Sequence, residues 1–112
     1  MAGDEFGRAA ADLVRRLRRW SPAGWAVSVD AGRFAPARTR AEAVHRTVQR
    51  LADLSAAGEG RPPRPVPRLE DRVLPDQLSV MAHDVRGLGD AAAEQAALAE
   101  ITDLRELLGL RR

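Results

Sequence analysis

The chain has 112 residues, of which 45% are hydrophobic and 30% are charged, and this composition is typical of one globular domain rather than of a disordered chain. It contains no cysteine, which excludes disulfides, thiolate nucleophiles and cysteine-ligated zinc. We expect a single domain over residues 1–112 that is cytoplasmic and does not enter a membrane, because the N-terminus is acidic and no apolar run exceeds a few residues.

The charges are unevenly distributed along the chain. All 18 basic residues are arginine, which indicates a GC-rich gene and weakens any functional interpretation of a single arginine. Residues 1–68 hold 13 arginines and 7 acidic residues, for a net charge of +6, whereas residues 69–112 hold 5 and 9, for a net charge of −4. The two parts are therefore expected to attract each other, within one chain or between two.

The first predicted helix covers residues 4–20. Its apolar side chains form one stripe, made of Phe6, Ala10, Leu13, Leu17 and Trp20. On the opposite arc lie four candidate contacts for phosphate or for a partner protein, Arg15, Arg16, Arg18 and Arg19. Asp12 lies within this arc and neutralises part of it.

Residues 22–37 allow more than one interpretation. Ser21 followed by Pro22 is a typical helix start, which favours a short helix or irregular coil. The alternation at Trp25, Val27 and Val29 also fits a small β-hairpin, with a turn at residues 30–32. We expect a non-helical or hairpin excursion in an otherwise helical domain.

The second long helix is predicted over residues 40–56. Thr39 and Glu42 form a capping-box pattern, in which each side chain satisfies a free backbone N–H group of the other residue. The predicted buried stripe is Ala41, Val44, Val48, Leu51 and Leu54.

A proline-rich crossover follows over residues 58–68. Its prolines favour an extended path of the polyproline type. Pro62 and Pro65 form a P-x-x-P pattern that a proline-recognising domain could bind, although a rigid connection is the commoner reason for such a segment.

Two further helices are predicted over residues 75–87 and 90–109, with glycines between them. Both carry leucine-rich stripes, and these exceed what one small core needs to cover. We therefore predict a homodimer, with candidate self-association residues Ile101, Leu104 and Leu108. The competing arrangement is a monomer in which these two helices fold back onto the first two.

No motif for catalysis or for a cofactor is present. His45 and His83 lie on different predicted helices and lack the spacing of a metal site, no serine lies in a nucleophile elbow, and no phosphate loop is found. We assign no catalytic, metal-binding or cofactor-binding residue. A general base at His83 is the one enzymatic alternative.

The sequence thus predicts an all-α domain of four helices that acts as a non-catalytic protein-interaction or regulatory module. It would self-associate or dock on a partner protein. The alternative from a different class is a nucleic-acid-binding protein that uses the arginine arc of the first helix, and salt-dependent binding to DNA would distinguish it.

Overall fold

The computed structural model describes residues 4–29 and 38–110 and is mostly helical. Its elements in chain order are α1 (Glu5–Leu17), α2 (Pro22–Trp25), β1 (Ser28–Val29), β2 (Arg38–Thr39), α3 (Arg40–Gly58), the short 3-10 helix η2 (Asp71–Val73), α4 (Leu74–Gly87) and α5 (Ala91–Leu107). The four long helices confirm the predicted all-α class. Among the described residues, no helix is long and apolar enough to cross a membrane.

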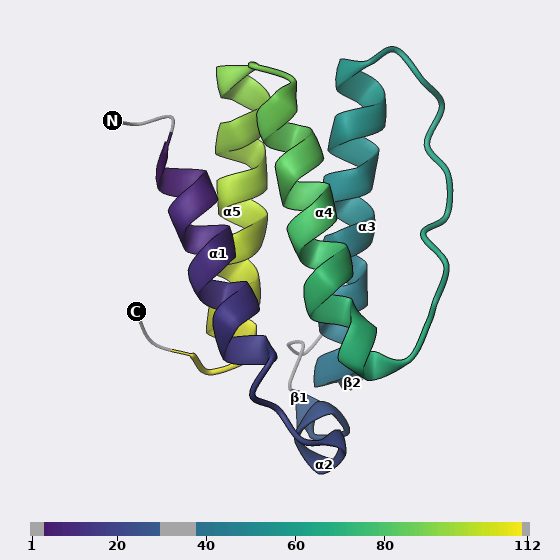
Figure 1. Ribbon diagram of the computed structural model, residues 1–112, viewed down its shortest axis with the longest axis vertical. Helices are drawn as coiled ribbons and strands as arrows, with labels where there is room; N and C mark the ends of the chain where they lie inside the picture. Colours follow the sequence, from purple (N-terminus) through teal and green to yellow (C-terminus); the bar gives the residue numbers. More distant parts are fainter. Residues whose placement is uncertain (1–3, 30–37, 111–112) are drawn as a thin grey trace.

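The four long helices form one bundle (Figure 1). α1 and α3 each pack against both α4 and α5, so the α4–α5 pair lies between them. Along the bundle, α1 and α5 run in one direction and α3 and α4 run in the other (Figure 1). Because α3 and α4 are parallel, the proline-rich crossover has to return along the whole length of the bundle before α4 can begin.

Two glycines shape the C-terminal end of α3. Gly60 has a φ of 69°, and the backbone N–H of Arg61 reaches the carbonyl of Ala56 at 2.8 Å, which is the hydrogen bond of a Schellman motif. Gly58 leaves room for the side chain of Leu88, since a Cβ at position 58 would lie 2.6 Å from a Leu88 methyl carbon. The turn between α4 and α5 therefore packs directly on the end of α3.

The sequence allowed either a short helix or a β-hairpin after α1, and the structure contains a short helix followed by a pair of β-strands. Ser21 caps α2, with its hydroxyl accepting a hydrogen bond from the N–H of Gly24 at 3.2 Å. β1 then pairs antiparallel with β2, with Val29 opposite Arg38. The second strand lies beyond the predicted limit at residue 37, and the predicted turn at residues 30–32 lies outside the described residues.

Two predicted helix ends were too late. α1 ends at Leu17 rather than Trp20, because the N–H groups of Arg19 and Trp20 bond to carbonyls three residues back in a tightened turn before Pro22. Arg18 and Arg19 therefore belong to a turn and not to the helical arc. α5 ends at Leu107, two residues before the predicted limit, and such differences are common at helix ends.

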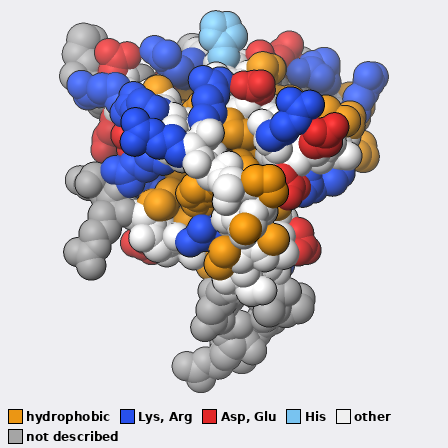
Figure 2. Space-filling model, turned by 60° about the horizontal axis from the view of Figure 1, so that its bottom comes forward, with side chains coloured by type: hydrophobic (Ala, Val, Ile, Leu, Met, Phe, Trp, Pro, Cys, Tyr) orange, Lys and Arg blue, Asp and Glu red, His pale blue; other side chains and the backbone are white. Residues whose placement is uncertain are grey.

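The opposite charges of the two halves meet within one chain. Among the described residues, four exposed ion pairs join residues 1–68 to residues 69–112, namely Arg18–Asp76 at 2.8 Å, Arg50–Glu100 at 3.4 Å, Arg68–Asp71 at 2.5 Å and Asp4–Arg86 at 3.3 Å. Figure 2 shows basic and acidic side chains lying among one another, with apolar side chains between them. These ion pairs connect the two parts of the sequence within a single chain.

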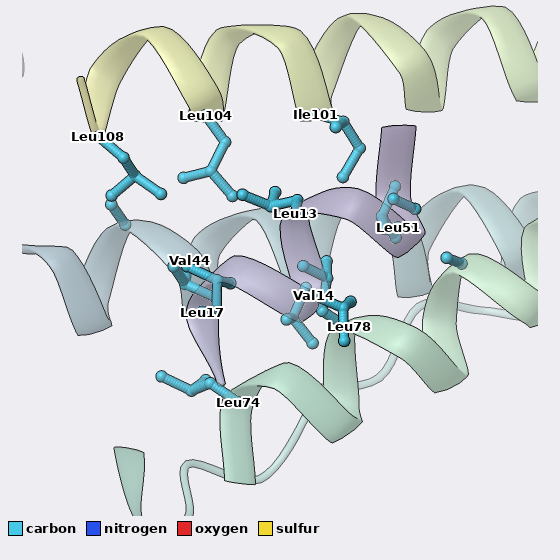
Figure 3. Close-up of a cluster of buried hydrophobic side chains, with 14 of the residues drawn as sticks. Leu13, Val14, Leu17, Val44, Leu51, Leu74, Leu78, Ile101, Leu104 and Leu108 are labelled. Carbon is cyan, nitrogen blue, oxygen red and sulfur yellow. The ribbon is translucent and has the colours of Figure 1, made fainter. Parts of the chain in front are cut away.

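The core consists mainly of leucine, valine and alanine side chains, and all four long helices contribute to it (Figure 3). The candidate self-association residues Ile101, Leu104 and Leu108 are exposed by 0%, 3% and 4%. Side chains of the same chain cover them, including Leu13 of α1 and Val44 of α3 (Figure 3). The stripes of α4 and α5 therefore need no second copy to bury them, and this removes the reason for choosing these three residues as a dimer surface.

The capping box of α3 is formed as predicted. The N–H of Glu42 donates to the Thr39 hydroxyl at 3.1 Å, and the N–H of Thr39 donates to the Glu42 carboxylate at 3.0 Å.

We predict that Thr39→Ala lowers the free energy of unfolding by about 1 kcal/mol and that Glu42→Ala lowers it by less. Urea unfolding measures both, and unchanged midpoints would show that the cap does not stabilise α3.

Candidate functional site

The arginine arc predicted on the first helix is largely committed to carboxylates. Arg15 and Arg16 both bond to Asp12, at 2.7 and 3.2 Å, and Arg18 bonds to Asp76 at the start of α4. Arg19 is exposed in the turn after the helix. Three of these four arginines therefore already have a carboxylate partner within the chain.

A different basic surface lies on the outer face of α3. Here a groove with a volume of about 620 Å³ is lined by side chains from β2, α3 and the end of the crossover. We call it the α3 groove, and its residues are Arg38, Glu42, His45, Arg46, Gln49, Arg50, Asp53 and Arg68. Four arginines outnumber two carboxylates, so the groove favours an anionic ligand.

Both carboxylates of the α3 groove already accept hydrogen bonds. Glu42 belongs to the capping box, and the bond from the Thr39 backbone N–H is the main cause that lowers its pKa, followed by the Thr39 hydroxyl and the nearby charges of Arg38 and Arg68. Asp53 accepts a hydrogen bond from the amide of Gln49 at 2.9 Å. These carboxylates are therefore fixed in place beside the arginines.

The four arginines of the groove differ in their partners. Arg50 pairs with Glu100 of α5, and Arg68 pairs with Asp71. Arg38 and Arg46 form no ion pair within residues 4–29 and 38–110, and the Nε atom of Arg38 is buried without a hydrogen-bond partner. Within the described residues, neither of these two guanidinium groups is therefore held in an ion pair.

One wall of the α3 groove is the crossover, which side chains of α3 hold in place. Gln49 accepts a hydrogen bond from the N–H of Val66 at 2.7 Å and donates one to the carbonyl of Arg64 at 2.9 Å. The Nε2 atom of His45 lies 3.1 Å from the carbonyl oxygen of Val66. Val66 itself is buried, so the wall is anchored by both its backbone and its side chain.

On the α5 side the basic surface ends in a smaller cleft of mixed charge. The cleft, of about 260 Å³, extends from Arg46 and Arg50 to Glu100 and Asp103, with Leu104 and Leu107 also lining it. The two acidic residues limit the anion-binding surface on this side.

His83 lies on the exposed side of α4. It borders a shallow hollow together with Glu59 and Asp84, and no hydrogen bond to its ring is found in the described part of the chain. Glu59 is engaged with Arg61, whose hydrogen bond and charge lower the pKa of that carboxyl. No group of three or more potential ligands that could hold a metal ion occurs among the described residues.

Compared with known protein families, with curated proteins and with solved structures, the chain matches none.

Sequence reasoning missed the α3 groove for an identifiable reason. Arg46 and Arg50 are four residues apart on one helix face, and that spacing can be seen in the sequence. Arg38 and Arg68 reach the same face only through the β1–β2 pairing and the anchored crossover. The cluster is thus partly local and partly created by the fold.

We predict that the triple substitution Arg15→Gln, Arg18→Gln and Arg19→Gln lowers the free energy of unfolding by less than about 1 kcal/mol. The one pair it breaks across the bundle, Arg18–Asp76, is solvent-exposed on both sides, and such pairs contribute little. Urea unfolding at moderate salt measures the change. A loss of several kcal/mol would show that these arginines hold α1 on the bundle.

We also predict that the pKa of Glu42 lies below 4.5 and rises toward that value in Thr39→Ala, which removes the hydroxyl donor but keeps the backbone donor. Because the folded state has the lower pKa, the contribution of Glu42 to stability is present above pH 4.5 and is lost as the pH falls through the lowered pKa. An NMR titration of the Glu42 carboxyl carbon tests this, and a value at or above 4.5 in the unmodified protein contradicts it.

Proposed function

We propose that this protein is a non-catalytic interaction module that docks on an acidic segment of a partner protein through the α3 groove. The observation that carries the proposal is the pair of guanidinium groups on Arg38 and Arg46, which line a groove whose two carboxylates are already hydrogen-bonded.

The chemistry of arginine supports a carboxylate partner. A guanidinium group presents a planar fork of donors that matches a carboxylate in a two-point hydrogen bond. Arg38 and Arg46 come from β2 and α3, so one acidic segment lying along α3 would meet both. The groove is built on a helix and an anchored wall, which reduces the entropy lost on binding.

An acidic protein segment fits the surroundings better than a nucleic acid does. Glu42 and Asp53 lie inside the groove, and Glu100 and Asp103 border it, so a long phosphate backbone would meet repulsion beyond the arginines. The tryptophans are also engaged elsewhere. Trp25 is buried, and Trp20 packs against Trp25 and beneath Arg40, so neither offers a free face for stacking on bases.

The test uses a fluorescent ten-residue peptide of glutamate and aspartate with glycine spacers, and measures its binding by anisotropy at low salt. We predict that Arg38→Gln with Arg46→Gln weakens binding about 2- to 30-fold, because each charge–charge contact at an exposed site is worth roughly 0.2–1 kcal/mol. The matched control is Arg8→Gln with Arg19→Gln, which removes the same charge from exposed positions outside the groove and should leave binding nearly unchanged.

Equal loss in both double variants would mean that the peptide responds only to net charge, and the proposal would then fail. A DNA duplex of similar charge serves as the comparison ligand. If the duplex binds more tightly than the peptide and is the ligand that loses affinity on removal of Arg38 and Arg46, the groove is a nucleic-acid site and the proposal is overturned.

A further inference from the structure

A second hollow lies on the other side of the anchored crossover, between the crossover, α3 and α4. We call it the crossover pocket, and its volume is about 250 Å³. Its apolar lining consists of Ala52, Ala56, Pro65, Val66, Pro67 and Met81. The role proposed above for the α3 groove does not use this pocket.

We propose that the crossover pocket receives one large apolar side chain, such as phenylalanine, from the same acidic partner segment that binds the α3 groove. This inference rests on the proposed function and adds the chemistry of the partner: acidic residues joined to an apolar anchor.

The size and lining of the pocket support an apolar occupant. A cavity of about 150 Å³ with apolar walls is large enough to hold a benzene molecule, so a hollow of about 250 Å³ accepts the ring of a phenylalanine. Protein-binding sites commonly take such an anchor in a pocket and surround it with polar contacts. Here the polar surroundings are Ser55, Arg61, Arg64 and Asp84.

The position of the pocket links it to the α3 groove. The two hollows meet at the anchor point of the crossover, because Gln49 lines the groove and also bonds to Arg64 and Val66, which line the pocket. One partner segment crossing the proline-rich segment near Val66 would therefore reach both hollows.

The charges at the rim of the pocket agree with the same partner. Arg64 is exposed and forms no ion pair within the described ranges, whereas Arg61 is engaged with Glu59. Arg64 can therefore pair with an acidic residue of the partner that lies next to the apolar residue entering the pocket. Asp84 on the far rim limits this complementarity to the Arg64 side.

The pocket is formed before any partner binds. Its outer wall is fixed by the two bonds of Gln49 and by the bond from Gln77 to the carbonyl of Pro67 at 3.1 Å. Proline residues in that wall have little backbone freedom to lose. A partner side chain therefore enters a shaped site, which favours affinity.

The experiment compares two acidic peptides that differ only in one end residue, phenylalanine or alanine. With the unmodified protein, we predict that the phenylalanine peptide binds about 10- to 100-fold more tightly, as expected for burying one large apolar side chain. In Ala52→Leu the larger side chain on α3 occupies the pocket. This substitution should abolish the preference for the phenylalanine peptide and leave the affinity for the alanine peptide unchanged. The matched control is Ala99→Leu, which adds the same atoms at an exposed position of α5 and should keep the preference.

A second measurement does not depend on the stability of Ala52→Leu. The methyl resonance of Met81 in the unmodified protein should shift on addition of the phenylalanine peptide and stay in place with the alanine peptide.

Three other results of these experiments would contradict the proposal. Equal binding of both peptides, with loss in the Arg38→Gln and Arg46→Gln variant, overturns the pocket and leaves the proposed function standing. A phenylalanine preference that survives Ala52→Leu, or that leaves Met81 unshifted, places the anchor elsewhere and also overturns it. Absence of binding by either peptide removes both proposals.

Discussion

The parallel orientation of α3 and α4 is the constraint on which the other features of the structure depend. It forces residues 59–70 to run along the outside of the bundle, where every residue except Val66 is exposed to water. Prolines reduce the number of N–H groups to be satisfied, and Gln49 provides partners for two of the remaining backbone groups. Fixing the crossover at Val66 leaves a hollow on each side of it, and these two hollows are the α3 groove and the crossover pocket.

The distribution of charge follows the same arrangement. The acidic α4–α5 pair lies between α1 and α3, so the basic residues nearest to it are taken up by ion pairs such as Arg18–Asp76 and Arg50–Glu100. Exposed pairs of this kind contribute little to stability, but they determine which arginines stay available to another molecule. Arg38 and Arg46 share the smaller cleft with Glu100 and Asp103 of α5, but within the described residues they form no ion pair with these carboxylates.

Local signals in the sequence were sufficient for most of the fold. The capping box at Thr39 and the apolar stripes of the four helices act over a few residues, so they could be recognised without the structure. The ends of the helices and the assembly of the site depend on distant partners. The helical wheel of the first segment could not show that Asp76 meets Arg18, nor that the chain turns before Arg19. Likewise, nothing local indicates that Gln49 bonds to a crossover residue 17 positions away.

The position of α1 in the bundle also has a consequence during synthesis. α1 packs mainly on α4 and α5, which leave the ribosome long after it. For the several seconds needed to make the intervening chain, the apolar side chains of Phe6, Leu13 and Leu17 have no native surface to cover them. During synthesis α1 therefore keeps an uncovered apolar face until α4 and α5 have been made.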